Sequence, residues 1–134
     1  MPTNIPPPSD ILVDTDVMID CLRGHPEALA FLKSHANQII LSPIVIVELY
    51  AGARGDMELA EIDRFVKGSP EAPVTAEIAR IAGLYRRDYG KSHGVGLGDA
   101  ILAATAKSLG VELKTLNVKH YPMLSGLKPP YRKT

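Results

Sequence analysis

The sequence predicts an α/β protein in which helices cover both faces of a parallel sheet. Short, mostly apolar runs of the kind that form buried strands occur at residues 11–13, 39–41 and 111–115. The segments between these runs have the apolar spacing and the capping residues of helices. Strands that alternate with helices are typical of a parallel sheet, because each pair of parallel strands needs a crossover connection.

The composition fits one soluble domain. The chain has 134 residues, of which 46% are hydrophobic and 22% are charged, as in ordinary globular proteins. Its fifteen basic and fifteen acidic residues cancel, which argues against non-specific coating of nucleic acid but allows a local basic groove. The single cysteine, Cys21, has no partner for an internal disulfide. Because the sequence also shows no signal peptide and no membrane-spanning run, we expect a cytoplasmic protein that does not enter a membrane.

Capping residues and helix breakers place the helices in order. Thr15 is a good N-cap residue directly after the first strand, and Pro26 suits the first turn of the second helix. Ser42, which precedes a proline, and Thr75 are further N-cap residues, and Gly110 is a suitable C-terminal stop. We expect a first helix from residue 15 onward, and later helices over residues 27–34, 43–53, 57–67, 75–89 and 99–109.

We expect a single domain over residues 10–127. Residues 1–9 contain four prolines and are predicted to be a flexible leader, and residues 128–134 are predicted to be a basic tail. Residues 72–74 are a candidate strand, in which proline is acceptable only at the start or on an edge. The glycine-rich segment 90–98 is predicted to be a loop.

Three acidic residues occupy unusual positions. Asp14 ends the first strand, Glu48 interrupts an apolar helix after the second strand, and Asp99 begins a helix rich in alanine. Elements that follow parallel strands emerge at one edge of the sheet, so these carboxylates can converge. Oxygen ligands without a Cys or His cluster suit a hard ion such as Mg²⁺ or Mn²⁺. Such an ion activates water, so the pattern predicts metal-assisted hydrolysis of a phosphodiester.

Each of these acids also has a purely structural interpretation. Asp14 and Asp99 are suitable helix N-caps, and Glu48 can face the solvent. Asp16 and Asp20 are typical of acids on an exposed helix face, although Asp16 is close enough in sequence to Asp14 to join a site. The joint placement of the acids, rather than any single one, favours the functional interpretation.

Four segments of the chain resemble PIN-domain ribonucleases, most closely the VapC-type toxins of toxin–antitoxin pairs. They are Val-Asp-Thr-Asp-Val at 13–17, Ser-Pro-Ile-Val-Ile-Val-Glu-Leu at 42–49, Leu-Gly-Asp-Ala-Ile-Leu-Ala-Ala at 97–104 and Thr-Leu-Asn-Val-Lys-His-Tyr at 115–121. Each segment is a loose match alone, but the four occur in the order that the family has. The resemblance covers residues 11 to about 124, nearly the whole chain.

The resemblance implies a three-layer α/β/α sandwich with a central parallel sheet of about four to five strands. It also implies endonucleolytic cleavage of RNA that depends on Mg²⁺ or Mn²⁺, a homodimer, and a small antitoxin that blocks the site. By position, the residues that match the metal site are Asp14, Glu48 and Asp99. Asn117 matches an assisting catalytic position, and Thr15, Asp16 and Thr115 are expected to support the site.

The closing segment departs from the family. Where the family frequently has an Asp-Phe pair, this chain has His120 and Tyr121, and no acid follows Thr115. This segment therefore supplies no fourth carboxylate, and whether a second metal ion binds is not decided by the sequence. His120 is either an exposed structural histidine or a catalytic one. Three arginines are candidates for phosphate contacts or for an ordinary solvated helix face: Arg80, Arg86 and Arg87.

Two rival functions remain at this point. A haloacid-dehalogenase-type phosphatase is one, because Asp14-Thr15-Asp16 after an apolar strand resembles its nucleophile motif, although Met18 stands where that motif has Thr or Val. The other is a non-catalytic member of the PIN fold that binds RNA or protein, and the absence of an acid near Asn117 favours it.

Overall fold

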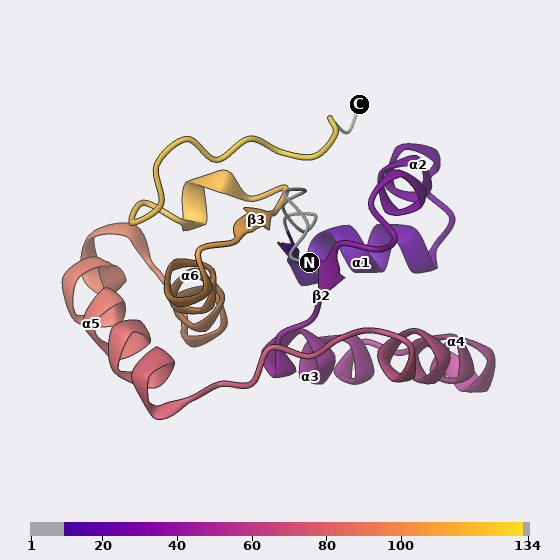
Figure 1. The fold of residues 1–134 in the computed structure, drawn as a ribbon, viewed down its shortest axis with the longest axis horizontal. Coiled ribbons are helices and arrows are strands. Elements are labelled where there is room, and N and C mark those ends of the chain that lie inside the picture. Colours follow the sequence, from indigo (N-terminus) through magenta and orange to yellow (C-terminus); the bar gives the residue numbers. More distant parts are fainter. Residues whose placement is uncertain (1–9, 133–134) are drawn as a thin grey trace, which may run out of the picture.

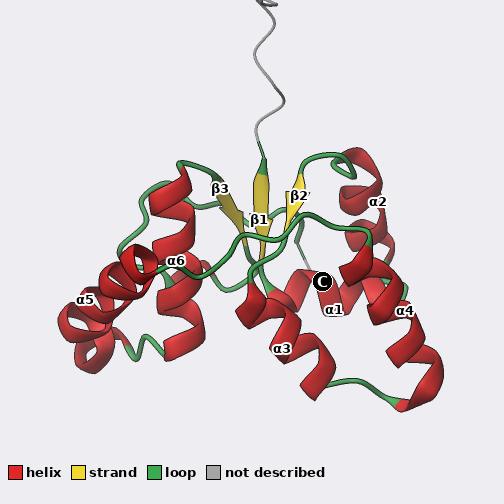
Figure 2. Ribbon diagram, turned by 60° about the horizontal axis from the view of Figure 1, so that its bottom comes forward, coloured by secondary structure: helices red, strands yellow, loops and turns green. Residues whose placement is uncertain are grey.

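The computed structural model describes residues 10–132, which form one parallel sheet with helices on both sides (Figure 1, Figure 2). The strands are β1 (Ile11–Val13), β2 (Ile39–Ile40) and β3 (Glu112–Lys114), in the spatial order β2-β1-β3. The central strand β1 is completely buried. The predicted α/β class with a parallel sheet is confirmed. The leader at residues 1–9 and the last two residues of the predicted tail lie outside the described part.

The helices cover the sheet from two sides. In Figure 2, α5 and α6 lie to the left of the strands, and α1, α2 and α4 lie to the right. None of the helices within residues 10–132 is long and apolar enough to cross a membrane. The helices are α1 (Thr15–Leu22), α2 (Pro26–Ser34), α3 (Pro43–Ala51), α4 (Gly55–Lys67), α5 (Ala76–His93), α6 (Leu97–Leu109) and the short 3₁₀-helix η1 (Val118–His120).

The sheet has three strands in the described part of the chain, so the expected number of four to five strands is wrong. The candidate strand at residues 72–74 does not form. Instead, Leu41 makes one isolated parallel bridge to Glu71, and the amide of Ala72 donates to the carbonyl of Leu41 at 2.7 Å. Leu41 bonds to Pro70 and Ala72, so the next bond of a parallel ladder would need the N–H group of residue 43. That residue is Pro43, which has no N–H group and begins α3, so the pairing stops after this bridge.

The predicted loop at residues 90–98 is also wrong in its extent. Helix α5 continues through Gly90 to His93 and ends at Gly94, whose φ of 64° is the left-handed conformation that glycine adopts without strain. Val95 in the short connection is buried, and α6 begins at Leu97. Asp99 therefore lies within the first turn of α6 rather than at its first residue. Packing of α5 along α6 explains why a glycine inside the helix is tolerated.

The predicted tail folds back onto the domain. The hydroxyl of Tyr131 donates to Asp20 of α1 at 2.7 Å, and its ring stacks on His25 with the ring centroids 5.3 Å apart. Lys128 and Arg132 on either side remain exposed. Tyr131 thereby fixes the end of the described chain against the first two helices.

Replacing Tyr131 with Phe is expected to lower the free energy of unfolding by about 1 kcal/mol, because the half-buried hydrogen bond to a carboxylate is lost while the ring is kept. Urea unfolding followed by circular dichroism measures the change. A free energy equal to that of the unmodified chain would mean that this contact contributes nothing to stability.

Candidate active site

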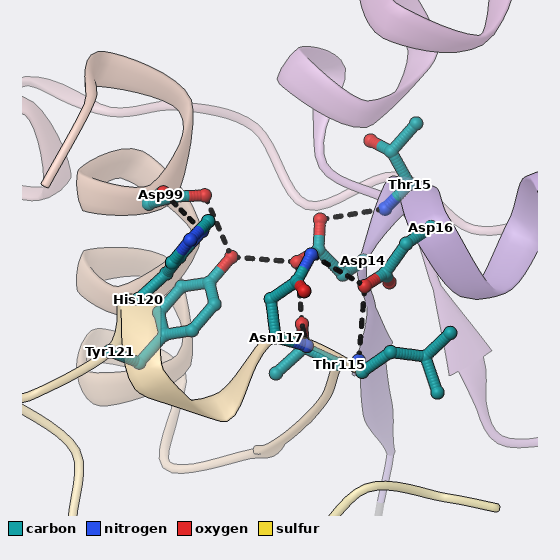
Figure 3. A network of polar contacts seen from close by, with 9 residues as sticks. Asp14, Thr15, Asp16, Asp99, Thr115, Asn117, His120 and Tyr121 are labelled. Carbon is teal, nitrogen blue, oxygen red and sulfur yellow. Dashed lines mark hydrogen bonds and ion pairs between the residues drawn. The ribbon is translucent and has the colours of Figure 1, made fainter. Parts of the chain in front are cut away.

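Asp14 is held at the carboxyl end of β1 by three hydrogen-bond donors. Its Oδ1 accepts from the amide of Thr15 at 2.7 Å, which makes Asp14 the N-cap of α1. Its Oδ2 accepts from the hydroxyls of Thr115 and Tyr121, each at 2.8 Å. The residue is only 8% exposed. Asp14 thus combines the capping role with a place at the centre of a polar network (Figure 3).

The parallel pairing of β1 with β3 explains why Thr115 reaches Asp14. Val13 is aligned with Lys114, and the amide of Asp14 donates to the carbonyl of Lys114 at 2.9 Å. The next residue on each strand is therefore a neighbour across the sheet. Thr115 is fully buried, and its hydroxyl also accepts from the amide of Asn117 at 3.1 Å. The supporting role expected for Thr115 stays a prediction.

Asp99 reaches the same network through Tyr121. The Tyr121 hydroxyl lies 3.2 Å from Asp99 Oδ1, so a single hydroxyl group lies between Asp99 and Asp14. His120 Nδ1 lies 3.4 Å from Asp99 Oδ2, and the side chain of His120 is 57% exposed. Sequence reasoning did not assign Tyr121 to the site. The only signal was a tyrosine where the resembling family has phenylalanine.

Glu48 is exposed on α3, but its carboxylate contacts the residue that follows Asp14. Its Oε1 accepts from the hydroxyl of Thr15 at 2.8 Å. Both carboxylate oxygens lie within 4 Å of the place where a side chain on Gly98 would begin. Glu48 therefore lies between the residue after Asp14 and the residue before Asp99. The structure brings the three predicted carboxylates to one edge of the sheet.

Asp16 and Asn117 form a neighbouring pair. Asp16 Oδ2 accepts from the amide of Leu116 at 3.1 Å and from Asn117 Nδ2 at 3.2 Å. The side chain of Asn117 therefore contacts Asp16, and the hydrogen bonds of the described residues do not join it to Asp14 or Asp99. This contact ties the closing segment to the first turn of α1. The catalytic role expected for Asn117 stays a prediction.

The carboxylates repel one another electrostatically. Burial, and next the charge of Asp14, raise the pKa of Asp16 from its ordinary 3.8 to about 6. Burial also raises the pKa of Asp99, and the charge of Asp14 acts in the same direction, against the hydrogen bond from Tyr121. Within residues 10–132, the contact with His120 is the only ion pair that involves these acids. A bound cation would relieve this repulsion.

The raised pKa of Asp16 predicts that stability falls as the pH rises from about 4 to about 7 in EDTA. Between its unfolded and folded pKa values, Asp16 binds more protons in the folded state, so deprotonation above this range destabilises the fold. The expected loss is on the order of 2 kcal/mol. Urea unfolding at several pH values measures it.

Because other carboxylates also titrate in this range, Asp16→Asn is the matched variant for this pH experiment. We expect the free energy of unfolding of the unmodified chain, relative to that of Asp16→Asn, to decrease with rising pH. A difference between the two proteins that is constant or increases with pH would contradict the assignment of the shift to Asp16.

The three candidate arginines lie apart from this network. Arg80, Arg86 and Arg87 are exposed on α5, and Arg87 pairs with the adjacent Asp88 at 2.9 Å. Helix α6 lies between α5 and the sheet (Figure 1). The hydrogen bonds and ion pairs of the described residues connect none of the three to the carboxylates. A role in phosphate contact stays a prediction.

The donor set fits a hard divalent cation that keeps part of its water. Within residues 10–132, no three His, Cys, Asp or Glu side chains are placed to enclose a metal ion by themselves. Asp14 and Asp99 lie on either side of one hydroxyl, and Glu48 approaches from α3. Mg²⁺ sites often use one or two carboxylates, with water and substrate phosphate oxygens completing the octahedron. The arrangement suits such an open site better than a closed structural one.

Comparison with known proteins agrees with the fold. Residues 11–120 match the model of the PIN domain. The chain is 42% identical over 124 residues to Ribonuclease VapC19 of Mycobacterium tuberculosis, and the match covers 90% of this chain and 98% of that protein. Ribonuclease VapC10 of the same species is also 42% identical over 124 residues, covering 90% of this chain and 92% of that protein.

Solved structures share the fold. A chain of a toxin–antitoxin complex from Klebsiella pneumoniae superposes with a TM-score of 0.79 at 27% identity, covering 92% of this chain and all of that one. A chain of the DNA-bound VapBC complex from Salmonella typhimurium superposes with a TM-score of 0.75 over 90% of this chain and 96% of that one. At 20% identity, the second likeness shows the fold alone.

Proposed function

This chain belongs to the PIN-domain family and is of the VapC type, and we propose that it is a Mg²⁺- or Mn²⁺-dependent endoribonuclease, the toxin of a toxin–antitoxin module. The observation that carries the proposal is the convergence of Asp14, Asp99 and Glu48 at one edge of the sheet. The ribonuclease relatives support RNA as the substrate. Because the family match spans most of the chain, the phosphatase alternative is not retained.

Asp14, Asp99 and Glu48 would hold the cation. When bound, it would supply the chemistry of a Lewis acid, a lowered pKa of a water molecule and neutralisation of charge on the phosphodiester. The chain fixes its own ligands beforehand. Asp14 cannot rotate freely because three donors hold it, and the hydroxyl of Thr15 orients Glu48. Glu48 is exposed, so a substrate phosphate can approach from its side.

The partners follow from the same family. Structures that contain similar chains include toxin–antitoxin complexes, which supports a cognate antitoxin that covers the site and suppresses cleavage in the cell. We also propose that the chain forms a homodimer and acts in the cytoplasm. Size-exclusion chromatography with light scattering tests the dimer, and co-expression with the neighbouring gene tests the antitoxin.

Incubation of the purified chain with total cellular RNA tests the proposed activity. We expect discrete fragments with Mg²⁺ or Mn²⁺ and intact RNA with EDTA. The alternative, a non-catalytic binding module, is favoured by the absence of an acid after Thr115. A folded protein that binds RNA but cleaves it with neither metal would support that alternative and contradict the proposal.

A further inference from the structure

Tyr121 is a buried residue with a hydroxyl between two carboxylates. The residue is 1% exposed, and its ring packs in the main hydrophobic core. The residue directly follows η1, where its amide donates to the carbonyl of Val118 at 3.2 Å. The hydroxyl oxygen lies 2.8 Å from Asp14 Oδ2 and 3.2 Å from Asp99 Oδ1 (Figure 3). The ring position is therefore fixed by packing, and the hydroxyl position by the ring.

One hydroxyl has one proton, so it can donate a hydrogen bond to only one of the two carboxylates at a time. The shorter contact indicates that the proton is donated mainly to Asp14. Asp99 then remains beside a neighbouring negative charge, and its ion-pair partner within residues 10–132 is an exposed histidine, His120. Two ionised carboxylates in contact with the same hydroxyl repel each other unless a cation lies between them. A rigid neutral donor between them holds the separation without adding a third negative charge.

We propose that Tyr121 is a positioning residue whose hydroxyl holds Asp14 and Asp99 at the separation at which they share one divalent cation. This inference rests on the proposed function. It gives the closing segment a part in the site although that segment contains no acid. If the hydroxyl instead occupied the position of the cation, removal of the hydroxyl would make metal binding tighter.

The test is a titration of Tyr121→Phe with Mn²⁺. The melting temperature is measured at each Mn²⁺ concentration, and cleavage of a fluorogenic RNA oligonucleotide is measured in parallel. Because loss of a group that orients metal ligands typically weakens metal binding by about 10–100-fold, we expect the half-saturating Mn²⁺ concentration to rise about tenfold. Cleavage at low Mn²⁺ falls, added Mn²⁺ restores kcat, and KM for the RNA is unchanged.

Tyr131→Phe is the matched control, because it also removes a tyrosine hydroxyl from an aspartate, here Asp20 on α1. It is expected to leave the half-saturating Mn²⁺ concentration unchanged. Thr115→Val is the second test variant, because it removes the other hydroxyl from the same oxygen of Asp14 without a contact to Asp99. We expect it to shift the Mn²⁺ requirement less than Tyr121→Phe does.

Each outcome bears on the inference. A Mn²⁺ response of Tyr121→Phe equal to that of the unmodified chain, or tighter, overturns the positioning role but leaves the proposed nuclease intact. A lower melting temperature with an unchanged Mn²⁺ response shows a merely structural role and also overturns it. If Tyr121→Phe does not fold, Thr115→Val takes its place. A half-saturating Mn²⁺ concentration of Thr115→Val equal to that of Tyr131→Phe would show that hydroxyl donors to Asp14 do not position the metal ligands, and it would overturn the inference. If the unmodified chain neither responds to Mn²⁺ nor cleaves RNA, the proposed function fails as well.

Discussion

Replacing Asp99 with Asn is expected to lower metal-dependent RNA cleavage by about a hundredfold or more, while the protein becomes no less stable. Asn keeps the shape of the side chain and can still contact the Tyr121 hydroxyl. It removes one of the charges proposed to hold the cation. Because burial and the charge of Asp14 raise the pKa of Asp99, the ionised group is unfavourable in the folded state, and its loss relieves repulsion.

Initial rates at saturating Mn²⁺, together with melting temperatures in EDTA, measure both effects. Asp63→Asn is the matched control, because Asp63 also accepts a tyrosine hydroxyl, from Tyr50 at 2.6 Å, but on an exposed surface. We expect the control to cleave RNA at the unmodified rate. Activity of Asp99→Asn equal to that of Asp63→Asn would remove Asp99 from the site.

Replacing Leu12 with Ala is expected to lower the free energy of unfolding by about 2–5 kcal/mol. Leu12 is the middle residue of the central strand and is completely buried, with β2 on one side and β3 on the other. Truncation leaves a cavity that the two flanking strands prevent from collapsing. A loss of this size is a large part of the total stability of a small domain, about 5–15 kcal/mol.

Urea unfolding monitored by circular dichroism measures the loss. Met57→Ala provides the comparison, because Met57 is 82% exposed on α4 and its truncation is expected to change stability by about 0.5 kcal/mol or less. Similar small losses for both variants would contradict the placement of β1 at the centre of the core.

The elements that sequence reasoning predicted well are those with a strong local signal. The strand at residues 11–13 forms as expected, Ser42 and Thr75 cap their helices through their side chains, and Gly110 ends α6 in the left-handed conformation. Asp14 and Glu48 follow β1 and β2, so their approach was predictable, because parallel strands end at the same edge of the sheet. Asp99 follows α5 rather than a strand, so its approach to Asp14 depends on how α6 packs.

The features that were missed depend on tertiary packing. Gly90 weakens a helix locally, yet α5 passes through it because the helix packs along α6. The number of strands depended on whether pairing continues past Leu41, and it stops because Pro43 lacks an N–H group and begins α3. The position of Tyr121 between Asp14 and Asp99 requires the turn at η1, and no local pattern in the sequence encodes that contact.

The most direct test of the central claim, hydrolysis of RNA by an activated water molecule, is cleavage in ¹⁸O-labelled water with Mn²⁺, followed by mass spectrometry of the new ends. Attack by water forms a new bond from the water oxygen to phosphorus, and the bond to the leaving sugar oxygen breaks, with a proton passing to that oxygen. We expect one ¹⁸O atom in each new terminal phosphate and no cleavage in EDTA. Ends that carry a 2′,3′-cyclic phosphate without ¹⁸O, or RNA cleavage that continues in EDTA, would contradict metal-dependent hydrolysis by water.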